Sequence, residues 1–202
     1  MEASNKLIHA LNKYLADFVV AEPKKMAELS GAVWEDPNIV VPFLNKTITV
    51  NSKTGEMNPE PPGILERILI LKYLLEAQGM TPPTVDDEYI AFRQLTYGSH
   101  HQEAFRLEVT EPLRDAFGRD LPLFAKVAES FGGIKSSGGD MAYTISYFPK
   151  ISLRIIIWEA DDEFPAQSAC LFDKKSQFHL DTDGLNELAN SLTAILLKEA
   201  NK

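Results

Sequence analysis

The sequence predicts an α+β fold in which a small antiparallel sheet packs against several helices. Apolar residues recur every three or four positions over residues 7–19 and 185–196, which is typical of amphipathic helices. Over residues 143–148, 153–158 and 168–172 the helical spacing of apolar residues gives way to runs of residues that favour β-strands. Because short connections separate these three runs, we expect them to pair as an antiparallel meander.

The N-terminal part of the chain, residues 1–62, begins with two predicted helices. The amphipathic stretch 7–19 ends before Pro23, which suits the first turn of a second, short helix over residues 23–29. Gly31 then provides a natural helix end.

A β-hairpin is predicted after these helices. The β-rich runs 39–44 and 47–50 are separated by Asn45 and Lys46, which we expect to form a two-residue turn. Pro42 cannot donate a backbone hydrogen bond, so it places the first run at the edge of a sheet. The sequence leaves open whether this hairpin joins the main sheet.

Residues 63–202 form the main part of what we expect to be a single domain over residues 1–202. The stretch 64–77 is nearly apolar all round and predicts a central helix that is buried on most of its surface. Segment 51–63 contains three prolines and two glycines, which predicts a loop before that helix.

Three more helices are expected between this central helix and the C-terminus. Ser99 and Gln102 have the spacing of a capping box, and Pro112 should kink or divide the helix that they open. A helix is predicted over residues 121–131, and Asp183 is expected to open the last amphipathic helix.

The charge balance argues against nucleic acid and membranes as partners. The chain carries 20 Lys and Arg against 29 Asp and Glu, a formal charge of −9 that repels phosphate backbones and anionic lipid. Its close basic pairs, Lys24-Lys25 and Lys174-Lys175, lie far apart in the sequence. The most apolar stretch, residues 64–75, is interrupted by charges and falls short of the roughly 20 residues that span a membrane.

The single cysteine, Cys170, excludes an internal disulfide and a four-cysteine zinc or iron–sulfur site. Its apolar neighbours predict a buried and inert thiol in a strand, whereas a nearby histidine and a depressed pKa would make it a nucleophile. Polar residues interrupt the apolar positions of the first twenty residues, so we expect no signal peptide and a cytoplasmic location.

An acidic turn between two apolar strands is the most unusual segment. Asp161, Asp162 and Glu163 are consecutive, and Trp158 and Phe164 flank them. Three carboxylates could bind a hard cation such as calcium or magnesium. Because consecutive side chains point apart, such a site would need further ligands from distant parts of the chain. A solvated hairpin turn explains the same residues more simply.

Two other segments invite functional hypotheses. Residues 132–140 hold four of the eleven glycines, but a phosphate-binding loop would need a lysine where Gly139 stands, so a flexible connector is the simpler interpretation. His100 and His101 lie at a predicted helix start, where they could titrate near neutrality or bind a metal. Adjacent residues diverge by about 100° on a helix, so the pair is more consistent with surface residues.

The C-terminal two thirds of the chain resembles a family of bacterial and archaeal domains of unknown function. The resemblance spans roughly residues 64–200 and depends on six motifs that occur in the same order: Leu71-Lys72-Tyr73-Leu74-Leu75, Ala91-Phe92-Arg93-Gln94-Leu95, Phe131-Gly132-Gly133, Tyr147-Phe148-Pro149, Trp158-x-x-Asp161-Asp162-Glu163-Phe164-Pro165-Ala166 and Leu171-Phe172-Asp173. Members of the family occur mainly in anaerobes, alone or fused to an iron–sulfur domain of the type found in corrinoid proteins. The resemblance implies a corrinoid or redox setting, and a corrinoid or iron–sulfur protein as a partner. Since this chain has no cysteine cluster, it cannot itself hold such a cluster.

Three functional hypotheses follow from these observations. The first is a non-catalytic ligand-binding or accessory protein, for a corrinoid or another large cofactor, with the ligand-binding residues Arg93, Trp158, Asp161, Asp162 and Glu163. The second is a metal-assisted enzyme that uses the acidic turn together with His100 or His101. The third is a structural partner-binding module with an exposed apolar patch. The residues alone do not identify a cofactor.

Overall fold

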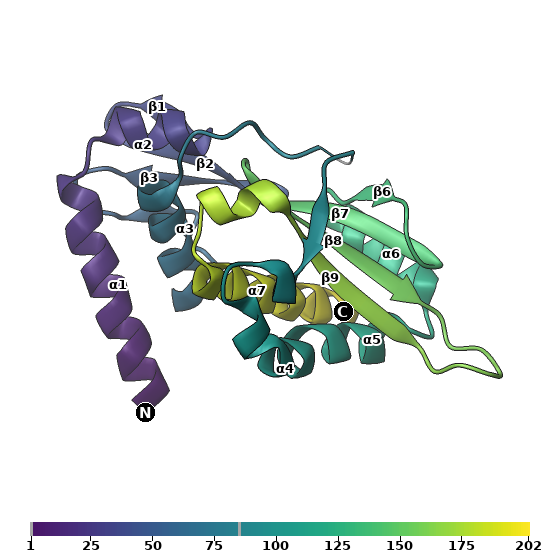
Figure 1. The fold of residues 1–202 in the computed structure, drawn as a ribbon. Helices are drawn as coiled ribbons and strands as arrows, with labels where there is room; N and C mark the ends of the chain where they lie inside the picture. The colour runs from purple at the N-terminus through teal and green to yellow at the C-terminus, as the bar shows by residue number, and fades with distance from the viewer. Residues whose placement is uncertain (1, 85) are drawn as a thin grey trace.

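The computed structural model describes residues 2–84 and 86–202 and contains two separate antiparallel sheets flanked by helices (Figure 1). The strand order is β1-β2-β3-β4 in the first sheet and β5-β9-β8-β7-β6 in the second. The α+β prediction is confirmed, and the predicted meander consists of β7, β8 and β9. The strands are β1 (Val33–Glu35), β2 (Asn38–Phe43), β3 (Lys46–Asn51), β4 (Met57–Asn58), β5 (Tyr89–Ala91), β6 (Ile134–Ser136), β7 (Met141–Phe148), β8 (Ile151–Trp158) and β9 (Gln167–Asp173).

The helices follow the predicted pattern closely in the long elements. The α-helices are α1 (Glu2–Val20), α2 (Pro23–Ser30), α3 (Ile64–Glu76), α4 (Gln102–Phe105), α5 (Glu111–Phe117), α6 (Leu121–Ser130) and α7 (Thr182–Ala200). Short 3₁₀ turns occupy η1 (Phe92–Gln94), η2 (Gly98–His101) and η4 (Lys174–Phe178), and η3 (Arg106–Thr110) is a π-helical segment.

One face of the five-stranded sheet packs against helices. The hydroxyls of Tyr147 in β7 and Ser191 in α7 lie 2.7 Å apart, and Ser191 donates to Glu66 of α3 at 2.5 Å. The ring of Tyr143 meets Phe124 of α6 edge-on, with the ring centroids 5.6 Å apart. Figure 1 shows α6 behind the sheet and no helix in front of β7 and β8. We call this side, over which no helix lies, the outer face.

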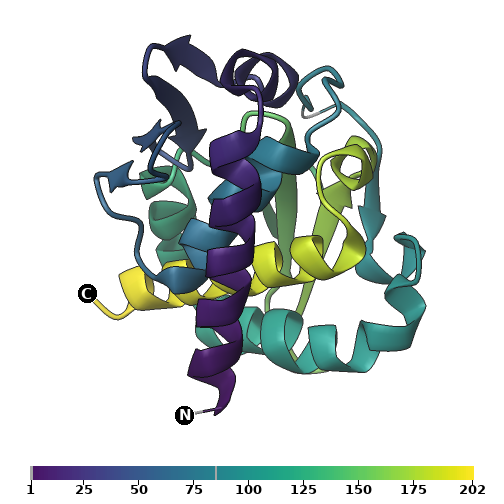
Figure 2. The same ribbon diagram turned by 90° about the vertical axis from the view of Figure 1, so that its left-hand side faces the viewer.

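Helix α3 connects the two halves of the molecule. Residues 68–74 are all buried, as the apolar stretch predicts. The ring of Tyr73 stacks on Phe148, with the centroids 4.3 Å apart. Its hydroxyl donates to the carbonyl of Ser30 at 2.5 Å and accepts from the backbone nitrogen of Lys150 at 3.1 Å. Figure 2 shows α1 lying over α3, with α7 crossing behind them.

The predicted hairpin forms strands β2 and β3 of a sheet that is separate from the main one. The two sheets meet where the backbone nitrogen of Leu44 donates to the carbonyl of Tyr147 at 3.1 Å and Phe43 packs edge-on against the Tyr147 ring. The turn lies one residue earlier than predicted, because Lys46 pairs with Phe43 and leaves Leu44 and Asn45 as the turn residues. Leu44 accordingly has a positive φ of 51°.

The prediction that Pro42 lies in an edge strand is wrong. Strand β2 lies between β1 and β3. The pairing with β1 ends at Val40, so Pro42 has no neighbour on that side that would need its missing N–H.

The predicted capping box at Ser99 and Gln102 is also wrong. Residues Gly98 to His101 form a 3₁₀ turn, and α4 begins only at Gln102, without a side-chain cap. The helix is divided near Pro112 as predicted, by the π segment that precedes α5.

The last helix is capped by Asp181 and not by Asp183. The Asp181 carboxylate accepts a hydrogen bond from the backbone nitrogen of Gly184 at 2.7 Å, which places Asp183 inside the first turn.

Four strands were not expected from the sequence: β1, β4, β5 and β6. Each has three residues or fewer. Such segments carry too little periodicity to be recognised, and their partners lie elsewhere in the chain. Strand β6 interrupts the glycine-rich stretch 132–140, and β5 extends the sheet beyond β9.

The hydrophobic core is one cluster that reaches from Leu11 in α1 to Leu196 in α7 and includes side chains from both sheets. Within the described residues, no helix combines the length and the apolar character that crossing a bilayer requires.

His179, which follows η4, is completely buried against α3 and the segment after it. Its Nδ1 accepts a hydrogen bond from the backbone nitrogen of Gln78 at 3.4 Å, and its ring centroid lies 6.3 Å from that of Tyr73. Burial, assisted by the positive charge of Lys150, lowers the pKa of His179 to about 4. The folded protein therefore holds this imidazole in its neutral form at neutral pH.

Replacing Tyr73 by Phe should lower the free energy of unfolding by about 1–3 kcal/mol, because the Ser30 carbonyl and the Lys150 N–H would be left unpaired in the core. Urea denaturation would measure the change. Tyr97→Phe is the control, since that side chain is 76% exposed and should change stability by less than about 0.5 kcal/mol. A Tyr73→Phe variant as stable as the wild type would contradict the bridging role.

The stability of the wild type should acquire a pH dependence from His179. Between its unfolded pKa of 6.5 and its folded pKa of about 4, the unfolded chain binds more protons, so stability falls as the pH falls through this window. The contribution reaches about 3 kcal/mol at the acid end. His179→Gln should remove this slope in urea titrations, and His9→Gln on exposed α1 should retain it.

Candidate functional site

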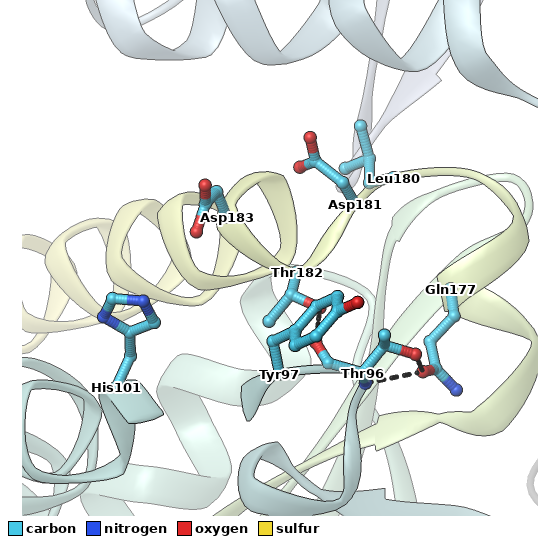
Figure 3. A pocket seen from close by; sticks show the side chains of 8 residues that line it. All are labelled: Thr96, Tyr97, His101, Gln177, Leu180, Asp181, Thr182 and Asp183. Carbon is cyan, nitrogen blue, oxygen red and sulfur yellow. Dashed lines mark hydrogen bonds between the residues drawn. The ribbon is translucent and has the colours of Figure 1, made fainter. Parts of the chain in front are cut away.

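A cavity of about 470 Å³ lies between the η1–η2 connection and the start of α7 (Figure 3). We call it the Tyr97 pocket. Its lining comes from two segments that are about eighty residues apart in the sequence. These residues are Thr96, Tyr97, His101, Gln177, Leu180, Asp181, Thr182 and Asp183.

Direct hydrogen bonds join the two sides of the pocket. The backbone nitrogen and the hydroxyl of Thr96 both donate to the side-chain oxygen of Gln177, at 3.1 and 3.2 Å. The hydroxyl of Thr182 donates to the carbonyl of Thr96. Because both segments are held by these bonds, the shape of the pocket is defined without a ligand.

Tyr97 is the most unusual residue of the pocket. Its φ of 62° is in the left-handed region, which costs a non-glycine residue roughly 1–2 kcal/mol. Its side chain is 76% exposed, so core packing does not explain the aromatic ring at this position. Figure 3 shows the ring beside Thr182, with His101 on one side and Gln177 on the other. Strained residues that packing does not require occur preferentially at functional sites.

The charged groups of the pocket are carboxylates. Asp181 pairs with Lys72 of α3 at 2.7 Å and also caps α7. Burial by itself raises the pKa of Asp181, but the hydrogen bonds from Lys72 and the Gly184 N–H outweigh it and lower the pKa. Asp183 is exposed on the first turn of the helix. Lysine and arginine are not part of the lining, so an arriving ligand meets hydrogen-bond acceptors and an aromatic ring.

The acidic turn predicted as a site is the exposed tip of the β8–β9 connection. Asp161 accepts hydrogen bonds from the backbone nitrogens of Glu163 and Phe164 at 2.8 and 2.7 Å. These bonds lower the pKa of Asp161. Over the described part of the chain, no three His, Cys, Asp or Glu side chains are placed to hold a metal. The metal hypothesis for Asp161, Asp162 and Glu163 gains no support from this geometry and stays a prediction.

Arg93 and Trp158 lie in different places. Arg93 is exposed in η1, two residues after Ala91, the residue of β5 that pairs with Leu171. Trp158 is 39% exposed at the far end of β8, opposite Gln167. Neither residue lines the Tyr97 pocket, nor does the acidic turn. Their role as ligand-binding residues stays a prediction.

The outer face carries polar residues that sequence reasoning missed. Arg154 and Trp158 share this face because side chains alternate along β8. The guanidinium of Arg154 lies 4.1 Å from the ring centroid of Tyr89, and the Tyr89 hydroxyl lies 2.5 Å from that of Ser152. The sequence feature that could have indicated these residues was Arg154, the one arginine within an otherwise apolar strand.

Cys170 is buried in β9, as predicted. Burial raises the pKa of its thiol to about 12, so it is protonated and inert near neutral pH. Of the two predicted histidines, His101 lines the Tyr97 pocket, whereas His100 does not.

Residues 22–194 match the model of a family described as a domain of unknown function, DUF3786. The chain belongs to this family. The match extends the resemblance at residues 64–200 to α2 and the first sheet, and it includes both segments of the Tyr97 pocket. The comparisons with curated proteins and with solved structures return no match for this DUF3786 protein.

The backbone strain at Tyr97 is testable by itself. Tyr97→Gly should be more stable than Tyr97→Ala by about 1 kcal/mol, because glycine adopts a positive φ without cost. Thermal denaturation of both variants would measure the difference. Ser99 in the same turn provides the control pair, with Ala at least as stable as Gly at this position. Equal stability of the two Tyr97 variants would contradict the strain.

Proposed function

We propose that this DUF3786 protein is a non-catalytic ligand-binding or accessory protein and that the Tyr97 pocket is its ligand site. The strongest support is the combination of an exposed, strained aromatic ring with carboxylates in a cavity held open by hydrogen bonds. The cavity volume of about 470 Å³ lies within the range of sites for small molecules.

The lining supports a ligand that carries an ammonium or guanidinium group. Carboxylates only accept hydrogen bonds, so Asp183 requires donors from the ligand, whereas Asp181 already accepts from Lys72 and the Gly184 N–H. A cation placed against the face of Tyr97 gains a further attraction from the aromatic ring. The carboxylates also offset the positive end of the α7 dipole, which would otherwise repel a cation.

The cellular setting is part of the same proposal. The family resemblance supports corrinoid or redox metabolism in an anaerobe, with a corrinoid or iron–sulfur protein as a partner. The single buried thiol of Cys170 supports a cytoplasmic location. A whole corrinoid is too large for the Tyr97 pocket, so we expect such a cofactor to reach this protein on its partner or to bind on its surface. Absorption spectra with cobalamin, cobinamide and haem test direct binding; unchanged spectra and an unchanged melting temperature would contradict it.

Calorimetric titration with agmatine and spermidine, and with butanediol as an uncharged comparison, tests the pocket. We expect the amines to bind and the diol not to bind. Asp183→Asn and Tyr97→Ala should each weaken amine binding about tenfold or more, through the loss of a charge-assisted hydrogen bond and of the cation–aromatic contact.

Asp17→Asn on α1 is the matched control, because it removes one exposed carboxylate that does not line the pocket. It should leave amine binding unchanged. Amine binding that Asp183→Asn and Asp17→Asn weaken equally, and that Tyr97→Ala leaves unchanged, would reflect the net charge of −9 and not the pocket.

A further inference from the structure

A second hollow lies between residues 106–119, which comprise the π segment, α5 and the turn after it, and the β8–β9 connection. Two adjoining cavities of about 160 and 450 Å³ share Arg114, Ala166 and Gln167 in their linings. Arg106 lines the smaller cavity, and Arg119 lines the larger one. We call the combined hollow the arginine groove. It contains three of the six arginines of an acidic chain.

The π segment aligns these arginines. The backbone nitrogen of Glu111 bonds to the carbonyl of Arg106, five residues earlier. In such a turn, residues five apart lie on the same side of the helix, so Arg106 reaches the Glu111 carboxylate. Arg114, at the next turn, lies 3.6 Å from the same carboxylate. Pro112 accounts for the irregular turn, since it has no N–H to donate.

The walls of the groove are fixed at two points. The Ser168 hydroxyl donates to the carbonyl of Thr110 at 2.5 Å, which ties β9 to the π segment. At the other end, the backbone nitrogen of Ala160 donates to the carbonyl of Gly118 at 3.1 Å. A Cβ on Gly118 would lie only 2.4 Å from the Cβ of Ala166, so this close approach requires glycine.

The arginines differ in how far they are already paired. Arg106 is held by Glu103 and Glu111. Arg114 uses its Nε for Asp115 at 2.7 Å. For Arg119, the described residues supply no ion-pair partner. Arg119 and the remaining donors of Arg114 therefore face the larger cavity with unused hydrogen-bonding capacity.

We infer that the arginine groove is a binding site for a small organic oxyanion, a carboxylate or a phosphate ester with an apolar part. The planar forks of Arg114 and Arg119 suit two-pronged recognition of an oxyanion. Ala160, Pro165 and Ala166 form the opposite wall, where the apolar part of the ligand packs. The site is independent of the Tyr97 pocket, which lacks arginine and selects the opposite charge.

Calorimetric titrations with phenyl phosphate, benzoate and inorganic phosphate at one ionic strength test this inference. We expect one of the organic anions to bind with one-to-one stoichiometry and about tenfold or more tightly than inorganic phosphate. The comparison of phenyl phosphate with benzoate identifies the preferred oxyanion. Equal or absent binding of all three anions would overturn the inference.

Variants separate the groove from general charge effects. Arg119→Gln should weaken binding about tenfold, and it should keep the fold because this side chain is exposed. Lys53→Gln removes an exposed positive charge in the β3–β4 connection, outside the groove, and should leave the affinity unchanged. Gly118→Ala, confirmed as folded by circular dichroism, should also weaken binding by displacing Ala166. An equal loss in Lys53→Gln and Arg119→Gln would refute the site without affecting amine binding at the Tyr97 pocket.

Discussion

The bridge made by Tyr73 is the interaction on which the arrangement of this protein depends. Its ring stacks on Phe148 of the main sheet, while its hydroxyl holds the end of α2 through Ser30 and the β7–β8 turn through Lys150. A phenol suits this position because it combines a large apolar surface with one group that donates and accepts. Helix α2, the central helix α3 and the main sheet are thereby joined at one buried point.

The remaining polar contacts of the core extend this connection and shape the surface around it. Glu66, Ser191 and Tyr147 form a buried hydrogen-bonded chain between α3, α7 and β7. Lys72 on α3 reaches Asp181 at the start of α7, which fixes one wall of the Tyr97 pocket. The pocket is thus held rigid by α3, the same helix that packs at the centre of the core.

The two candidate sites have opposite chemistry, although both use the stretch between β5 and α6. The Tyr97 pocket presents carboxylates and an aromatic ring, whereas the arginine groove presents guanidinium groups opposite an apolar wall. The intervening helix separates them, and its π segment turns the arginines towards β9. A chain with a charge of −9 can therefore hold local regions of either sign.

The apolar pattern of the sequence by itself predicted the long elements α1, α3, α6, α7 and the meander β7–β9. Helices α1 and α7 repeat an amphipathic spacing over several turns, whereas α3 and β8 are nearly continuous apolar runs. The inert thiol of Cys170 followed from its apolar neighbours in the same way. Short strands such as β5, the cap at Asp181 and the separation of the two sheets depended on partners far along the chain. Only the tertiary structure brought Tyr97 to Asp183, and Arg119 to Ala166, because hydrogen bonds and close packing between distant segments leave no periodic trace in the sequence.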